Sequence, residues 1–271
     1  TDIVQQIQGE KSSSSQSVIS YLKPQGAIHL AQIMAAQFLE SKDQVESVQL
    51  FQAVLEIHGA GIVDYFHARF FTELAISLGN YALARQFLNS LQFKPLDRKI
   101  LECDLANPVN GGSNLARWLE LFNAPFVENG LEPVQLNSQK DCVNPEPLMD
   151  RVHAQPKELV QEGPLVSVII PIWCPGRSLV NSVRSILNQS WQNLEILLVD
   201  DCSPIDYQTI IQQCQEMDAR IRCFRQPENK GAYAARNIAL QNANGDFVTF
   251  QDADDWSHPR RIELQLRTLQ K

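Results

Sequence analysis

Beginning at Pro164, short apolar runs alternate with amphipathic helical stretches, and this alternation constrains the fold more than any other feature of the sequence. The runs with the composition of buried strands lie at 166–170, 194–200, 221–224 and 246–250. Strands separated by helices form βαβ units, in which the crossovers are right-handed and the strands lie parallel. We therefore predict an α/β domain with a mostly parallel sheet for residues 164–271.

Residues 17–107 follow another pattern, with apolar residues at helical spacing and no strand signal. The helical stretches are 27–41, 43–59, 62–78 and 82–91. Residues 78–95, with a weak echo 37 residues earlier, resemble the helix pair of a tetratricopeptide repeat. We predict an all-helical, repeat-like module that offers a surface to a protein partner, with an unrelated helical domain as the alternative.

Two further segments complete the predicted organisation. Residues 108–163 are rich in proline and glycine, which predicts a connector with one helix at 114–123 that packs against its neighbours. Residues 1–16 have the composition of a disordered or appended tail. The first residue is Thr1 and not methionine, so we expect a processed chain or an excised fragment.

Charge and composition exclude several classes of protein. The formal net charge of −8 argues against a protein that coats nucleic acid or an anionic membrane. No apolar run approaches the roughly 20 residues of a membrane-spanning helix, so we predict no transmembrane segment. The six cysteines show no metal-binding spacing, which favours reduced thiols in a cytoplasmic protein.

Acidic residues follow the second and fourth predicted strands. They are Asp200, Asp201, Asp252, Asp254 and Asp255. Ligands of parallel sheets bind outside the carboxyl ends of the strands, so we expect these carboxylates at one rim. Oxygen ligands suit a hard divalent cation such as Mg²⁺ or Mn²⁺, which takes further ligands from substrate phosphates. Any single aspartate pair fits a helix cap or a turn equally well.

Basic and aromatic residues accompany this predicted rim. Lys230 and Arg236 would supply positive charge for a phosphate, and Trp173 or Tyr233 a flat apolar surface. No G-x-G-x-x-G motif follows the first strand, which argues against a flavin or nicotinamide domain. A receiver domain would need the strand 194–200 to be first in the sheet, whereas 166–170 precedes it.

Four motifs carry a resemblance to a known family. VSVIIPIW, LVDDCSP, PENKGAYAARNIAL and GDFVTFQDADDW resemble, in order and spacing, the family 2 nucleotide-sugar glycosyltransferases of the GT-A fold. The match covers residues 164–271, the N-terminal, nucleotide-binding half of such a catalytic domain. The resemblance implies inverting, metal-dependent transfer of a sugar from a nucleoside-diphosphate sugar, with UDP-sugar favoured. The implied acceptor is a glycan or a lipid-linked molecule.

The resemblance also implies roles for particular residues. Asp200 and Asp201 would bind the base and ribose side of the nucleotide, and Arg236 the base or phosphate region. Asp252 would favour the ribose and Asp254 the metal, the two forming the DxD pair for Mn²⁺ or Mg²⁺. The remaining nucleotide-binding residues would be Pro171, Trp173, Asn229, Lys230 and Gly231. Asp255 would support the pair or cap the last helix.

One departure from the family pattern and one missing residue limit the resemblance. Cys174 stands where the family commonly has asparagine, which leaves the contacts of the first loop open. The catalytic base of the family would lie beyond Lys271, so we expect this chain to bind a nucleoside diphosphate with Mn²⁺ without turning over a sugar donor. A glycosyltransferase of this kind would be cytoplasmic, or peripheral at the inner face of the membrane. The alternative is a helical-repeat scaffold whose attached nucleotide-binding domain has lost catalysis.

Overall fold

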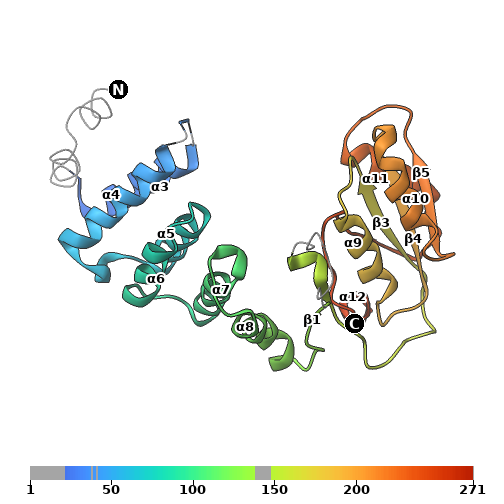
Figure 1. The fold of residues 1–271 in the computed structure, drawn as a ribbon, viewed down its shortest axis with the longest axis horizontal. Helices are drawn as coiled ribbons and strands as arrows, with labels where there is room; N and C mark the ends of the chain where they lie inside the picture. Colours follow the sequence, from blue (N-terminus) through green and yellow to red (C-terminus); the bar gives the residue numbers. More distant parts are fainter. Residues whose placement is uncertain (1–21, 38, 41, 138–147, 271) are drawn as a thin grey trace. The chain divides into compact units, whose positions relative to one another are not determined.

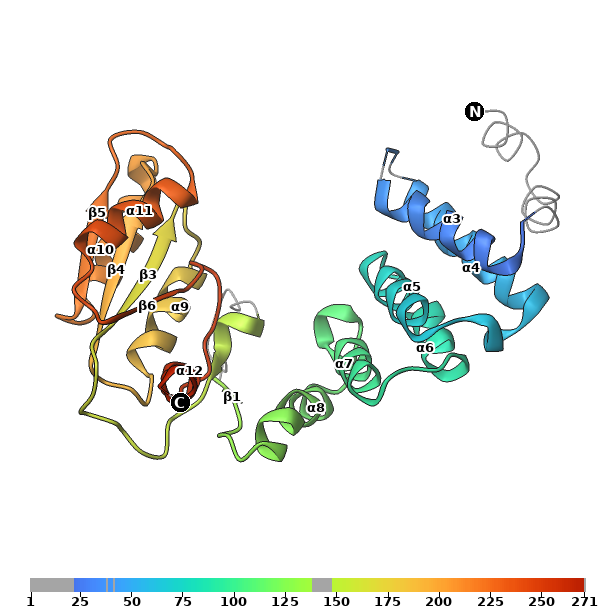
Figure 2. The same ribbon diagram turned by 180° about the vertical axis from the view of Figure 1, so that it is seen from behind.

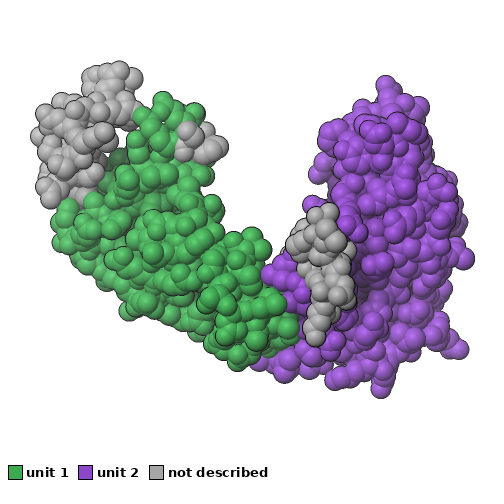
Figure 3. All heavy atoms as spheres, viewed as in Figure 1, with its two compact units in different colours: residues 1–124 green, residues 125–271 purple. Residues whose placement is uncertain are grey.

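The computed structural model describes residues 22–37, 39–40, 42–137 and 148–270. The predicted tail at 1–16, the expected start of the helical module at Ser17, and Cys142 lie outside the described residues. The chain divides into two compact units, residues 1–124 and 125–271, coloured separately in Figure 3. Each unit is considered by itself below.

The first unit is built of helices, which confirms the all-helical prediction for the N-terminal region. The helices are α3 (Pro24–Gln37), α4 (Asp43–His58), α5 (Tyr65–Ser77), α6 (Tyr81–Ser90), α7 (Pro95–Ala106) and the start of α8 (Leu115–Glu128) (Figure 1). Asp64 and Asn80 cap α5 and α6 by accepting hydrogen bonds from His67 N and Leu83 N. Pro95 begins α7, where its missing N–H costs no hydrogen bond.

Aromatic packing forms the core of the first unit. The rings of Phe51 in α4 and Phe71 in α5 stack with centroids 3.9 Å apart, and Phe87 in α6 meets Phe51 edge-on at 5.4 Å. All three side chains are fully buried. One core made from three successive helices explains why these short helices are stable, since isolated helices of this length are marginal in water.

The helix of the connector is longer than predicted. The sequence predicts it at 114–123, whereas α8 extends to Glu128 and contains Pro125 in its last turn. A proline there removes only one hydrogen bond to the preceding turn, and the helix ends shortly afterwards. Further along, β1 (Gln135–Leu136) and β2 (Val152–His153) form a short antiparallel pair that was not predicted.

The second unit contains the predicted parallel sheet, in the order β5-β4-β3-β6. The strands are β3 (Val166–Ile172), β4 (Leu194–Asp200), β5 (Ile221–Arg225) and β6 (Phe247–Phe250). The helices are α9 (Ser178–Leu187), α10 (Gln208–Gln215), α11 (Ala232–Asn242) and α12 (Arg261–Leu269). The sequence predicts that the last helix starts at Ser257 and Pro259, whereas α12 begins at Arg261, after the loop of residues 251–260.

The helices cover both faces of the sheet (Figures 1 and 2). Residues such as Val168 and Ile196 pack with α9, α10 and α12, while Ile169 and Leu197 pack with α11 on the other face. Burial on both faces explains why β3 and β4 are continuous apolar runs with no alternation. The arrangement confirms the predicted partial GT-A fold, with the sheet and helices of a βαβ domain.

A buried carboxylate links three segments at the amino end of the sheet. Glu195 in β4 accepts hydrogen bonds from Ser167 Oγ (2.6 Å), Asn244 N (2.6 Å) and Arg222 Nη1 (3.0 Å). Burial acts to raise the pKa of Glu195, but these hydrogen bonds outweigh it and hold the pKa below its usual value. Glu195 therefore stabilises the sheet in its charged form.

We predict that Glu195→Gln lowers the free energy of unfolding by about 1–3 kcal/mol at neutral pH, because the new amide faces the Asn244 and Arg222 donors. Because the pKa is lowered on folding, the ionised form stabilises the fold above the ordinary glutamate value. The difference between wild type and variant should then shrink as the pH falls below about 4.3. Urea unfolding from pH 3 to pH 7 measures it. Glu162→Gln, at an exposed position, is the control, and an equal effect of both variants would contradict the prediction.

Candidate functional site

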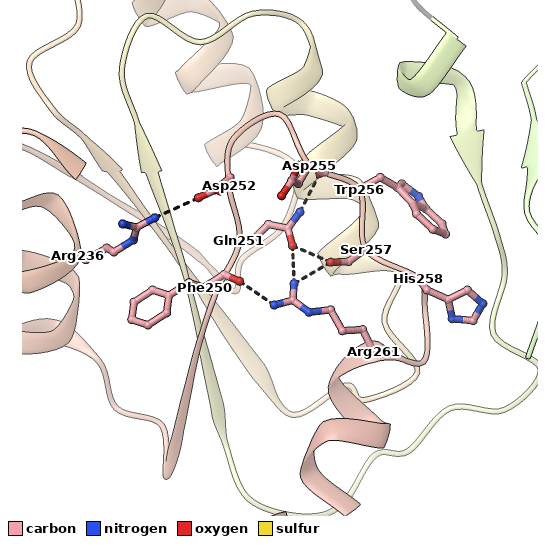
Figure 4. Close-up of a pocket in the computed structure, with 9 residues that line it drawn as sticks. All are labelled: Arg236, Phe250, Gln251, Asp252, Asp255, Trp256, Ser257, His258 and Arg261. Carbon is pink, nitrogen blue, oxygen red and sulfur yellow. Dashed lines mark hydrogen bonds and ion pairs between the residues drawn. The ribbon is translucent and has the colours of Figure 1, made fainter. Parts of the chain in front are cut away.

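The candidate site lies where the strand order reverses. From β3 the chain moves outward through β4 to β5 and then returns to the other side of β3 as β6. In open α/β sheets, ligands bind at such a switch point, outside the carboxyl ends of the strands. A cavity of about 430 Å³ opens at the end of β6 and is called the β6 cavity here (Figure 4). Its lining residues are Arg236, Phe250, Gln251, Asp252, Asp255, Trp256, Ser257, His258 and Arg261.

Arg236 and Asp252, both predicted from sequence, meet at the cavity. The guanidinium of Arg236 in α11 donates to Asp252 Oδ1 at 3.1 Å, and it lies over the rings of Tyr233 and Phe250 at 5.5 and 5.6 Å. Its Nε is buried and has no hydrogen-bond partner among the described residues. The head group is thus held in place by two aromatic rings, with donor capacity that the described residues do not use.

The three aspartates of residues 252–255, here called the acidic loop, remain exposed. Asp252 and Asp255 line the β6 cavity, whereas Asp254 does not. Asp254 makes no hydrogen bond or ion pair with the described residues. Within the described ranges, no three His, Cys, Asp or Glu side chains form a group that could hold a metal ion. The five aspartates predicted at one rim therefore do not converge on a single point.

Asp201 is buried and organises a neighbouring loop. Its carboxylate accepts hydrogen bonds from Lys230 N (2.8 Å) and Gly231 N (2.7 Å), and from the Gln226 side chain (2.6 Å). Gly231 has a φ of +86°, a backbone conformation that favours glycine, and it stands immediately before α11. Asp201 thus fixes the entry to the helix that carries Arg236.

Asp200 is also buried, and both of its oxygens are engaged. Oδ1 accepts from Ser203 N (2.9 Å), while Oδ2 accepts from Gln208 (3.1 Å) and forms an ion pair with Arg225 (3.0 Å). These contacts favour a structural role, in which Asp200 joins the end of β4 to β5 and to the turn before α10. The nucleotide contact of Asp200 or Asp201 stays a prediction.

The other predicted nucleotide-binding residues surround the site without lining the β6 cavity. Trp173 is exposed beyond the end of β3, while Pro171 is partly buried within that strand. Asn229 is exposed, and Lys230 forms an exposed ion pair with Glu228 (2.7 Å). The structure therefore brings together Arg236 with Asp252, and Asp201 with Lys230 and Gly231, as two adjoining groups.

Comparison with known proteins identifies the family of this segment. Residues 167–271 match the sequence profile of glycosyl transferase family 2. This segment belongs to that family.

Two relatives show how far the similarity extends. The chain is 42% identical over 103 residues to an uncharacterized glycosyltransferase of Haemophilus influenzae. It is also 42% identical over 103 residues to the putative teichuronic acid biosynthesis glycosyltransferase TuaG of Bacillus subtilis. Each match covers 38% of this chain and 41% of the relative. The chain therefore spans less than half the length of these two relatives.

A solved structure, TarS of S. aureus, matches 39% of this chain and 19% of its own length, at 25% identity and a TM-score of 0.36. The assignment of the family 2 segment rests on the sequence matches. Throughout the part of the chain that the structure describes, each helix is too short or too polar to cross a membrane.

Sequence reasoning missed two residues that hold the acidic loop of the family 2 segment. Gln251 is buried, and its amide donates to the Asp255 carbonyl (2.8 Å) while its oxygen accepts from Ser257 (2.7 Å) and Arg261 (2.6 Å). Arg261 also donates to Ser257 Oγ (2.8 Å) and to the Phe250 carbonyl (2.8 Å). Figure 4 shows these bonds closing the base of the loop.

A weak sequence signal for Arg261 did exist. Arg260 and Arg261 stand at the start of a helix, where the helix dipole disfavours cations, so a tertiary partner was implied. Burial lowers the pKa of Arg261, and the residue makes no salt bridge with the described carboxylates. Its charge therefore adds positive potential to the wall of the β6 cavity.

We predict that Arg261→Met destabilises the fold by about 1–3 kcal/mol and loosens the loop, because the buried acceptors of Gln251 and Ser257, and the carbonyl of Phe250, lose the guanidinium donor. Hydrogen exchange followed by mass spectrometry should show faster exchange at 251–257. Arg267→Met is the matched control on the same helix, since the Arg267 side chain is mostly exposed and its buried partner Glu263 keeps its hydrogen bonds from Ser190 and Arg260. Unchanged hydrogen exchange at 251–257 in the Arg261 variant would contradict the conclusion that Arg261 holds the acidic loop.

Proposed function

We propose that this chain carries the donor-binding part of a metal-dependent glycosyltransferase, which transfers a sugar from a nucleoside-diphosphate sugar to an acceptor hydroxyl. The observation that supports this most directly is the β6 cavity of the family 2 segment. It lies at the switch point of the sheet and combines a held arginine with exposed aspartates. UDP-sugar is the favoured donor.

The charges in and around the cavity support the proposed roles. Arg236 binds the base or phosphate region through the guanidinium donors that its hydrogen bond to Asp252 does not use. Asp252 accepts hydrogen bonds from the ribose, and Asp201 with residues 229–231 shapes the adjoining wall for the nucleotide. The positive charge of Arg261 favours the diphosphate without needing to contact it.

The donor set fits a hard divalent cation whose coordination shell is completed by the substrate. Asp254 and Asp252 offer exposed carboxylate oxygens on one loop, but the described residues hold no third ligand beside them. Mg²⁺ is commonly bound by one or two carboxylates together with waters and substrate phosphates. Asp254 would therefore hold Mn²⁺ or Mg²⁺, with Asp252 beside it, when the diphosphate is present. The bound cation would supply Lewis-acid stabilisation of the leaving diphosphate.

The chemistry of transfer sets what the residues must do. Breaking the sugar–phosphate bond builds negative charge on the diphosphate, which Arg236 and Arg261 stabilise. Inversion in one displacement requires a base that removes the proton of the acceptor hydroxyl. The name of the relative TuaG, which refers to teichuronic acid biosynthesis, supports a glycan or lipid-linked glycan as the acceptor.

We predict that the chain binds UDP only when Mn²⁺ or Mg²⁺ is present, measured by isothermal titration calorimetry with and without EDTA. Asp254→Asn should weaken binding more than tenfold, because a neutral amide cannot replace the carboxylate ligand, and Asp252→Asn should weaken it less. Asp206→Asn, at an exposed position outside the site, is the control. A parallel titration with GDP tests the preference for uracil.

Two other results would contradict the proposal. If neither UDP nor GDP binds with the metal, the alternative of a non-catalytic scaffold is favoured, with the helical module as its binding surface. If binding is unaffected by EDTA and by Asp254→Asn, the nucleotide site is independent of metal and the role given to Asp254 is wrong.

Arg236 provides a second test with a graded outcome. Arg236→Lys should retain part of the affinity for UDP with Mn²⁺, because the positive charge remains while the stacked guanidinium is lost. Arg236→Met should lose about tenfold or more, as expected for a charged hydrogen bond of 1.5–3 kcal/mol. Calorimetry under the same conditions measures both. Equal affinities of the two variants and the wild-type chain would contradict the assignment of Arg236.

A further inference from the structure

Residues 126–132, which precede the family 2 segment, pack against the loop that follows the acidic aspartates. The ring of Phe126 at the end of α8 stacks on His258, with centroids 5.0 Å apart and an angle of 21°. His258 in turn meets Trp256 edge-on at 6.0 Å. Both Trp256 and His258 line the β6 cavity. A row of three rings therefore extends from residue 126 to the cavity wall.

Hydrogen bonds define the tautomer of His258 and tie it to the same segment. The backbone N–H of Arg260 donates to Nδ1 at 3.2 Å, so Nδ1 is an acceptor and carries no proton. Nε2 must then carry the proton, and it donates to the carbonyl of Glu132 at 2.9 Å. His258 thus uses one nitrogen to shape its own turn and the other to hold residue 132.

Glu132 is itself fixed in place. Its side chain is buried, with 6% of the residue exposed, and Oε1 accepts from the backbone N–H of Lys157 at 3.2 Å. The other oxygen is buried without a hydrogen-bond partner in the described ranges. The carbonyl that accepts the hydrogen bond from His258 Nε2 therefore belongs to a residue whose side chain is buried and hydrogen-bonded.

The acidic loop has two supports, on either side. Gln251, just after β6, and Arg261, at the start of α12, close its base, and His258 follows the loop and contacts residues 126 and 132. We propose that His258 is a positioning residue, through which residues 126–132 set the geometry of the acidic loop for the donor. The binding site would then extend beyond the family 2 segment into the preceding chain. This inference rests on the proposed function, because the donor is what the loop would hold.

Two substitutions of His258 separate its two hydrogen bonds in the full chain. His258→Asn keeps an acceptor at the place of Nδ1 but has no group that reaches Glu132. His258→Gln places an amide N–H near the position of Nε2 and can keep the bond to Glu132. Phe126→Leu removes the stacked ring and keeps apolar volume. Phe66→Leu, at an exposed aromatic position in the first unit, is the control.

We expect His258→Asn and Phe126→Leu each to raise the dissociation constant for UDP with Mn²⁺ by about fivefold to tenfold, the effect of losing one such interaction. His258→Gln should stay within about twofold of wild type. The thermal unfolding midpoints of the variants should not rank in the same order as their dissociation constants. This comparison distinguishes a positioning role from a role in folding. Hydrogen exchange at 252–257 should be faster in the Asn variant than in the Gln variant.

Other outcomes would overturn the inference. Wild-type affinity and exchange in both His258→Asn and Phe126→Leu would show that the segment does not position the loop. Affinities that fall in step with the thermal midpoint would assign these residues to folding alone. If the unsubstituted chain binds no nucleotide, the proposed function fails. The inference is then decided by exchange, and equal rates in the Asn and Gln variants reject it.

Discussion

The parallel pairing of β3 with β4 and β6 is the constraint on which the second unit depends. Ile172 pairs with Asp200, and Ile169 with Phe250, so the segments that follow all three strands emerge at one edge of the sheet. Aspartates that are far apart in the sequence lie at this edge, and the burial of each one determines whether it is available to a ligand. Charges taken into the interior need partners, and charges left in solvent stay available to a ligand.

The two pairs of aspartates illustrate this division. Asp200 and Asp201 are almost fully buried, and each accepts several hydrogen bonds that join the ends of neighbouring strands. Asp252 and Asp254 are exposed. The first pair thus shapes the wall of the site, and the second supplies oxygens toward solvent. Aspartates at the ends of two strands of the same sheet therefore have different roles in the site, because one pair is buried and the other is exposed.

The sequence was sufficient for the four strands of the parallel sheet and the helices between them, but not for the short pair β1 and β2 or for the supports of the site. Buried runs such as residues 194–200 are recognisable because both faces of a central strand must be apolar. Asp252 and Arg236 were found because charged residues after a strand and on the next helix imply chemistry. Gln251 and His258 were missed because their partners are distant in sequence: Gln251 contacts Ser182, and His258 contacts Glu132. Polar contacts over such separations leave no local pattern.

The ion pair of Arg236 and Asp252 follows from the same balance of burial and exposure. The arginine side chain is 24% exposed and the aspartate 60%, so water screens their attraction and the pair contributes little to stability. A ligand that displaces one partner therefore loses little binding free energy by breaking the ion pair. The guanidinium also lies over the rings of Tyr233 and Phe250, and these contacts do not depend on Asp252. A weak ion pair on an arginine that also contacts two aromatic rings keeps the charges balanced in the free protein and lets an anionic group compete for the guanidinium at low cost.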